Sequence, residues 1–219
     1  MSGGRKGLFP ILVTVTLLLL GCANPAREHL NQGNTYAQQA MWDEAITEYN
    51  QALELAPGSA ESHIKRGIAY GNQADYDRAI ADFSQAVELD PGFALAYSQR
   101  GFSYFKTGDL ELAMANLDKA IELDDKLAEA YNYRGLIYIS RDQNQTALAE
   151  FNKAIELDPR LDVAYYNRAV VYFAGEQPEL SLANLNKVIE ISSNQFLIYL
   201  AKLAKQDVES NLSQDTPDS

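Results

Sequence analysis

Apolar and polar residues alternate along most of the chain with the 3.6-residue period of an α-helix. Between residues 26 and 195 the pattern divides into amphipathic segments of about 13 residues, in which apolar residues recur three and four positions apart. Short segments that contain Asp, Gly or Pro separate them, and proline does not continue a helix interior. The pattern therefore predicts an all-α protein built from paired helices.

The predicted helix pairs repeat with a constant period. The turn sequence LAPGS and its counterparts are spaced by 34 residues, starting at Leu55, Leu89, Leu123, Leu157 and Ile191. A unit of this size cannot bury its apolar face alone, so neighbouring units must stack. The spacing predicts five units, over residues 26–59, 60–93, 94–127, 128–161 and 162–195.

Small and aromatic residues hold fixed positions within these units. Position 8 is glycine in the first four units and Ala169 in the fifth, and position 20 is alanine in four units and Ser181 in the last. Position 11 is tyrosine throughout: Tyr36, Tyr70, Tyr104, Tyr138 and Tyr172. We expect the small residues to let the two helices of a unit approach closely, with bulky residues at positions 11 and 24 filling the remaining space.

This combination of period and residue types resembles the tetratricopeptide repeat (TPR) over 170 of the 219 residues. The resemblance implies a right-handed α-solenoid of five helix pairs, whose first helices line a concave face. Residues 196–208 begin a sixth unit in register, with Tyr199 at position 4 and Leu203 at position 8, and predict a capping helix. Residues 209–219 are polar and are expected to be a disordered tail.

By resemblance, members of the family usually bind peptides on the concave face. At the positions that line it, the chain changes from a mixed set in the first two units to a largely apolar set afterwards. The predicted partner-binding residues are Leu95, Phe102, Phe105, Tyr133, Leu136, Ile139, Tyr166, Val170 and Phe173, and Leu197 and Leu200 would extend the strip onto the cap. An exposed apolar strip of this kind marks an interaction surface, unless a second copy or the protein's own cap or tail covers it.

The chain also carries a short apolar run near its start. Arg5 and Lys6 precede 13 mostly apolar residues, from Leu8 to Leu20. The run is shorter than the roughly 20 residues of a membrane-spanning helix, and its layout is typical of a secretory signal. A short membrane anchor or a buried segment are the alternatives.

The sequence Leu19-Leu20-Gly21-Cys22 resembles the lipobox of bacterial lipoproteins. That resemblance implies that residues 1–21 are a signal peptide that is removed, and that the sole cysteine, Cys22, carries acyl chains such as palmitate. Residues 22–25 would form a short tether to the membrane. Ala23 follows the cysteine, where aspartate retains enteric lipoproteins at the inner membrane. The resemblance therefore favours the periplasmic side of the outer membrane.

Charge and candidate chemistry narrow the function further. The chain has 18 Lys and Arg against 30 Asp and Glu, a net charge of −12, which disfavours nucleic acid as a partner. The two histidines, His29 and His63, both occupy position 4, where the other units have tyrosine, and no third metal ligand stands at a suitable spacing. No catalytic set or cofactor motif is present. The sequence predicts a binding protein that is not an enzyme and needs no cofactor.

Four arginines at position 7, beginning with Arg66, could suggest an anion site. We expect instead that their stems lie along the helix pair and their guanidinium groups contact nearby Asp or Glu. Taken together, the sequence predicts a lipid-anchored adaptor of the bacterial cell envelope that binds a peptide or helix of a partner protein. The alternative is a structural homodimer held together by the apolar C-terminal groove and cap.

Overall fold

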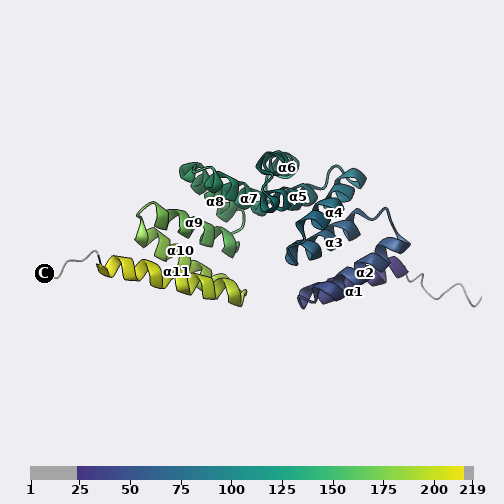
Figure 1. Cartoon of the computed structure of the whole chain (residues 1–219), viewed down its shortest axis with the longest axis horizontal. Helices are drawn as coiled ribbons and strands as arrows, with labels where there is room; N and C mark the ends of the chain where they lie inside the picture. The colour runs from purple at the N-terminus through teal and green to yellow at the C-terminus, as the bar shows by residue number, and fades with distance from the viewer. Residues whose placement is uncertain (1–23, 215–219) are drawn as a thin grey trace, which may run out of the picture.

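The computed structural model describes residues 24–214, and these residues form eleven α-helices and no strand. The helices follow one another along an arch, with α1 and α11 at its two ends (Figure 1). Their bounds are α1 Pro25–Gln38, α2 Trp42–Leu55, α3 Ala60–Asn72, α4 Tyr76–Leu89, α5 Ala94–Thr107, α6 Leu110–Leu123, α7 Ala128–Ser140, α8 Asn144–Leu157, α9 Asp162–Ala174, α10 Pro178–Ile191 and α11 Gln195–Gln214. The predicted all-α solenoid of five helix pairs is confirmed. The predicted signal peptide, residues 1–21, and Cys22 lie outside the described residues.

None of these eleven helices combines the length and the apolar character needed to cross a lipid bilayer.

Position 8 governs how closely the two helices of a pair approach. A Cβ atom on Gly33 would lie 2.5 Å from Cε1 of Tyr49, and one on Gly67 would lie 2.7 Å from Cε1 of Phe83. The bulky residue at position 24 therefore packs directly on the glycine backbone, as the sequence predicts. Both rings are almost completely buried, and they belong to one hydrophobic cluster that spans the first two units.

The turn inside each pair has the same geometry in all five units. The residue at position 15 has a positive φ, from 56° at Ala40 and Glu176 to 93° at Gly108. The following N–H donates to the carbonyl of the tyrosine at position 11, for example Asp75 N to Tyr70 O at 3.0 Å. This is a Schellman-type ending, which favours glycine at the left-handed residue. Only the third unit has glycine there.

The contacts between helices explain the curvature of the arch. Each odd-numbered helix contacts the next odd-numbered one, whereas no even-numbered helix in residues 24–214 contacts another even-numbered one. The odd-numbered helices therefore form the inner layer of the arch, and the even-numbered helices spread apart on its outer side (Figure 1). The family's first helices were expected on this concave side.

The position-7 arginines join consecutive units in a regular ladder. Each guanidinium contacts position 23 of its own unit and position 25 of the preceding unit, as when Arg66 donates to Asp82 at 2.8 Å and to Asn50 at 2.7 Å. Arg134 likewise contacts two carboxylates, as expected. Arg100 and Arg168 differ, since they donate to neutral side chains, those of Asn116, Ser84, Asn184 and Asn152.

The C-terminal helix differs from its prediction in register and length. The loop before α11 has three residues, Ser192 to Asn194, whereas four residues separate the earlier units. Asn194 caps the helix by accepting from the N–H groups of Phe196 and Leu197. The sixth unit thus starts at Gln195, one residue earlier than predicted, and α11 continues through residues 209–214, which were expected to be disordered.

The shifted register changes which residues of α11 are buried. Leu197 is only 7% exposed and packs with Ala201 and Val208 against α9 and α10, so it does not extend the concave strip as predicted. Tyr199 and Leu203, expected at positions 4 and 8, take positions 5 and 9 and are exposed. One deleted loop residue turns the helix by about 100° and accounts for both differences.

Candidate protein-binding groove

The nine predicted partner-binding residues all lie on the inner helices α5, α7 and α9. None of them is fully buried. Val170 and Phe173 are clearly exposed, at 44% and 39%, whereas the other seven are half-buried. The predicted strip is therefore open to solvent, but most of its area is shared with the packing between units.

Aromatic rings explain the partial burial in the middle of the arch. The rings of Phe102 and Tyr133 stack with their centroids 4.4 Å apart, and Tyr76 meets Phe102 edge-on at 6.5 Å. Burial raises the pKa of Tyr133 above its ordinary 10.0, against the lowering effect of a hydrogen bond with Gln99. The three rings tie the second, third and fourth units together.

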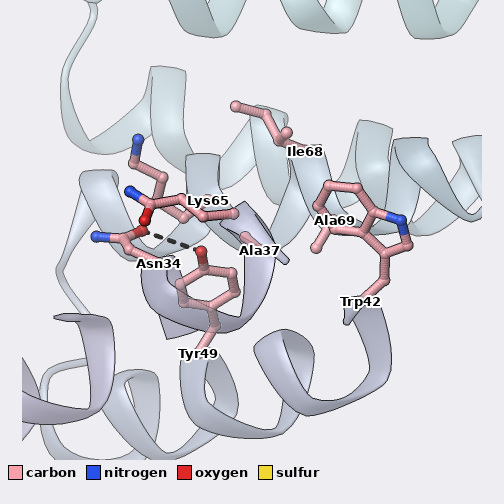
Figure 2. A pocket seen from close by; sticks show the side chains of 8 residues that line it. Asn34, Ala37, Trp42, Tyr49, Lys65, Ile68 and Ala69 are labelled. Carbon is pink, nitrogen blue, oxygen red and sulfur yellow. Dashed lines mark hydrogen bonds between the residues drawn. The ribbon is translucent and has the colours of Figure 1, made fainter. Parts of the chain in front are cut away.

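A cavity of about 380 Å³ opens between the first and second units. In Figure 2, Asn34 and Trp42 lie on opposite sides of the Tyr49 ring, with Ile68 across from it. The hydroxyl of Tyr49 donates to Oδ1 of Asn34 at 3.0 Å, which fixes the amide with its NH₂ group free to donate elsewhere. Burial raises the pKa of Tyr49 to about 12, so this hydroxyl stays a donor at neutral pH.

The polar groups of this first cavity are mainly donors. Lys65 is the only charged residue that lines it, and the apolar walls come from Trp42 and Ile68. The free NH₂ group of Asn34 and the ammonium group of Lys65, beside apolar walls, suit a segment that is apolar but carries carbonyl or carboxylate oxygens.

A second cavity, of about 170 Å³, continues along the inner face. It shares Ile68 with the first cavity, so the two are adjacent. Phe102 and Tyr133 form its apolar wall, and Asn72 and Gln99 supply carboxamide groups. The two cavities together form a groove that runs from the first unit to the fourth, and we call it the central groove.

The sequence identified only part of this groove. Of the nine predicted residues, only Phe102 and Tyr133 line its two cavities. Trp42 was not predicted, because it stands at position 17, on the second helix of its unit, whereas only first-helix positions were expected to face inward. A signal did exist, since Trp42 is the single tryptophan of the chain.

The histidines form hydrogen bonds rather than a metal site. Nδ1 of His29 lies 2.7 Å from Glu48, and Nδ1 of His63 lies 2.9 Å from Asp82. The two histidines occupy the position that is tyrosine in the other units, and each adds a hydrogen bond to an acidic side chain on the second helix of its pair. Across residues 24–214 no group of three His, Cys, Asp or Glu side chains could hold a metal ion.

Charge is strongly divided between the two layers. The inner helices α1, α3, α5, α7 and α9 carry seven Lys and Arg against four Asp and Glu, a net charge of +3. The outer helices α2, α4, α6, α8 and α10 carry four against fourteen, a net charge of −10. Most of the acidity of the chain therefore belongs to the outer layer. Four of the seven inner bases are the position-7 arginines, whose guanidinium groups contact the outer helices, so Lys65 is the only charged residue that lines the central groove.

Family models for the TPR repeat match residues 33–74, 103–140 and 135–175. Two further models of the tetratricopeptide repeat match residues 60–93 and 163–195. The comparison with curated proteins gave no match.

Several solved structures share the fold. The thermophilic TPR protein TTC0263 of Thermus thermophilus is 18% identical, with a TM-score of 0.74 over 84% of this chain and 98% of its own. MamA is 25% identical, with a TM-score of 0.58 over 76% of this chain and 91% of its own. YrrB, described as a TPR protein with an unusual peptide-binding site, is 27% identical, with a TM-score of 0.53 over 84% of this chain and 93% of its own.

Proposed function

The chain belongs to the tetratricopeptide repeat family, and from that premise we propose that it is an adaptor that binds an extended segment of a partner protein in its central groove. The observation that carries the proposal is the pair of adjacent cavities on the inner face, joined at Ile68. The likeness to YrrB, which is described as having a peptide-binding site, is consistent with it.

The lining of the groove indicates an extended rather than a helical ligand. An extended segment leaves its backbone N–H and C=O groups without internal partners, and these groups must be satisfied on binding. Gln38 offers both donors and an acceptor along the groove, and Asn34 has its NH₂ group free to donate. Asn72 already donates to the carbonyl of Ile68 at 2.9 Å and Gln99 already bonds Tyr133, so these two side chains offer only their remaining donor and acceptor capacity. The two cavities would receive two side chains of the segment, which gives sequence specificity.

Electrostatics favours a neutral or acidic segment. Lys65 stands in the larger cavity, and its ammonium group makes no ion pair with any described residue. A basic segment would be repelled by Lys65, whereas an acidic one would be attracted.

We further propose that the adaptor is held at the bacterial envelope by acyl chains on Cys22, with the outer membrane favoured. The support is the lipobox-like sequence before Cys22 and the short distance along the chain from Cys22 to Pro25, where α1 begins. A tether this short would keep the first unit near the bilayer and let α11, at the other end of the arch, project away (Figure 1).

Site-specific photo-crosslinking tests the groove. A photoreactive residue in place of Ile68 should give a discrete crosslinked product in cells, whereas the same residue in place of Leu112, an exposed apolar residue of outer helix α6, should not. Adding Lys65→Glu should reduce the product, and adding Lys119→Glu on α6 should leave it unchanged. Equal crosslinking at both sites, or no effect of Lys65→Glu, would contradict the proposal.

A further inference from the structure

Exposed apolar residues gather at the C-terminal end of the inner face, beyond the central groove. Eleven large apolar residues are exposed in residues 24–214, and the five on the outer helices are distributed over α2, α4, α6 and α10. The other six lie on α9 and α11: Val163, Val170, Phe173, Phe196, Tyr199 and Leu203. We call these six residues the C-terminal patch.

The shifted register of α11 is what creates half of the patch. With Leu197, Ala201 and Val208 packed on α9 and α10, the residues Phe196, Tyr199 and Leu203 share another face of the helix, at spacings of three and four. They are 68%, 61% and 46% exposed. In the corrected register they fall at positions 2, 5 and 9, which face the concave side in the other units.

A cavity lies between α9 and α11, beside the patch. It measures about 130 Å³ and is lined by Val170 and Phe173 of α9 together with Ala204, Asp207 and Val208 of α11. Asp207 is four residues from Leu203, so the stripe on α11 leads directly to the cavity. Helices α9 and α11 are in contact, so the two halves of the patch lie on neighbouring helices.

The patch differs from the central groove in what it offers a ligand. The residues that line its cavity include no carboxamide, and the hydroxyl of Ser181 donates to the carbonyl of Ala169 at 2.9 Å. An extended segment would therefore lose hydrogen bonds for its backbone here. An α-helix satisfies its own backbone and needs only an apolar face.

Charge then selects among the possible occupants. Asp207 is the only charged residue that lines the cavity. The chain as a whole carries −12, so a second copy of it and an anionic bilayer would both meet like charge. A partner helix whose apolar face is flanked by Lys or Arg would place its apolar side chains on the patch and a basic side chain beside Asp207.

From these contacts we infer that the C-terminal patch is a second docking surface, which binds an amphipathic helix with basic residues beside its apolar face. Its ligand differs from that of the central groove in conformation and charge. One partner could present an acidic extended segment to the groove and a basic helix to the patch, and either surface can act without the other.

Fluorescence anisotropy on the full-length protein, with a synthetic amphipathic helix of about 18 residues, tests this inference. The helix carries leucines at i, i+3, i+4 and i+7 with flanking lysines, and a second version replaces the lysines with glutamates. We expect the lysine helix to bind and the glutamate helix to bind more weakly. No binding of the lysine helix, or equal binding of the two, would overturn the inference.

Variants then locate the binding. The triple variant Phe196→Ser, Tyr199→Ser, Leu203→Ser should weaken binding by about tenfold or more, because clustered apolar residues dominate interface energies. The matched control Leu55→Ser, Leu89→Ser, Leu112→Ser removes similarly exposed residues of the outer helices and should change nothing. Asp207→Asn should weaken binding by about two- to fivefold, less so at high salt. Equal losses in the triple variant and the control would overturn the inference.

Two further measurements distinguish the other occupants. Sedimentation of wild type and triple variant would show a concentration-dependent dimer, lost in the variant, if a second copy covered the patch. Flotation with neutral phosphatidylcholine vesicles would show weaker binding of the variant if the patch entered a bilayer. Residues 1–23 are the same in both proteins, so their contribution cancels. Either result would overturn the helix as occupant, and identical behaviour of the two proteins supports it.

Discussion

Gly135 lies directly beneath the ring of Phe151, so that a Cβ atom on the glycine would be 2.6 Å from Cε1 of the phenylalanine. The ring is completely buried, and it has no free space into which it could move without displacing its neighbours. This contact joins α7 to α8, and the corresponding contacts join α1 to α2 and α3 to α4. The glycine at position 8 therefore sets the distance between the two helices of a pair.

Replacing Gly135 with alanine should therefore destabilise the protein, although alanine favours helix formation. We expect a loss of about 1–3 kcal/mol from overpacking, measured by urea unfolding. Gly71→Ala is the matched control, because Gly71 is also helical and a Cβ there would meet nothing within 4 Å. It should stabilise the protein by about 0.5–1 kcal/mol, and a loss of stability in both variants would contradict this account.

The left-handed residue at position 15 gives a second, reciprocal prediction. Ala74 has φ of 60° and Gly108, at the equivalent place in the next unit, has φ of 93° with no neighbour within 4 Å of its would-be Cβ. A left-handed backbone is strained for alanine but not for glycine. Ala74→Gly should therefore stabilise the protein by about 0.5–1 kcal/mol, and Gly108→Ala should destabilise it by about 1–2 kcal/mol. Thermal unfolding of both variants checks the opposite signs, and a shift of the same sign in both would refute the strain argument.

Much of the fold was predictable because it depends on local rules that repeat. The period of 34, the small residue at position 8 and the bulky residue at position 24 determine each helix pair, and each is visible in the sequence. The register of α11 could not be predicted in this way, because it depends on the loop after Ile191 being one residue shorter than the loops between the earlier units. The residues from Phe196 to Leu200 are all apolar or aromatic, so the sequence pattern fits either register. Only the packing of α11 against α9 and α10 selects one of them.

The candidate site was less predictable than the fold. Position in the repeat correctly placed residues such as Phe102 on the inner helices, but it could not show how much of each side chain the neighbouring units would cover. That depends on ring orientation, as in the stack of Phe102 on Tyr133. Trp42 reaches the groove from an outer helix, which no rule for first helices would reveal.

The ladder of position-7 arginines predicts unequal roles for its acidic partners. Burial raises the pKa of Asp82, but hydrogen bonds from Arg66 and His63 outweigh it and hold the pKa below its ordinary 3.8. In Glu150, burial and the charge of Asp118 outweigh the contribution of Arg134, and the pKa is raised above 4.5. Ionised Asp82 is therefore stabilising, whereas ionised Glu150 is costly.

Asp82→Asn should lower the free energy of unfolding at pH 7 by about 1–3 kcal/mol, because the amide keeps only one acceptor oxygen and places an NH₂ group where the second carboxylate oxygen accepts from Arg66 or His63. Glu150→Gln should cost less. A lowered pKa gives stability that is present at neutral pH and lost as the pH falls through it, so the difference between wild type and Asp82→Asn should shrink below pH 3.8. Urea unfolding at pH 7 and near pH 3 measures it; a difference that is constant with pH would contradict the assignment.

Lipid attachment at Cys22 is a prediction from sequence alone. Cells fed an alkyne analogue of palmitate should label the wild-type protein, and Cys22→Ser should abolish the label, because no other cysteine is present. The variant should also leave the membrane fraction. Ser98→Ala is a control that removes a buried hydroxyl with no hydrogen-bond partner and keeps Cys22. Labelling that persists in Cys22→Ser would mean that the lipid is attached elsewhere, and no labelling of the wild type would mean that it is not attached at all.

Two phenylalanines of the predicted strip, Phe102 and Phe173, should respond differently to the same substitution. Phe102 is half-buried and stacks on Tyr133, so Phe102→Ser should lower the free energy of unfolding by about 2–4 kcal/mol. Phe173 is 39% exposed, so Phe173→Ser should cost about 1 kcal/mol or less. Denaturant unfolding of the two variants measures the contrast. Equal costs would show that Phe102 faces solvent as freely as Phe173, and then the central groove would be wider than the stacked rings allow.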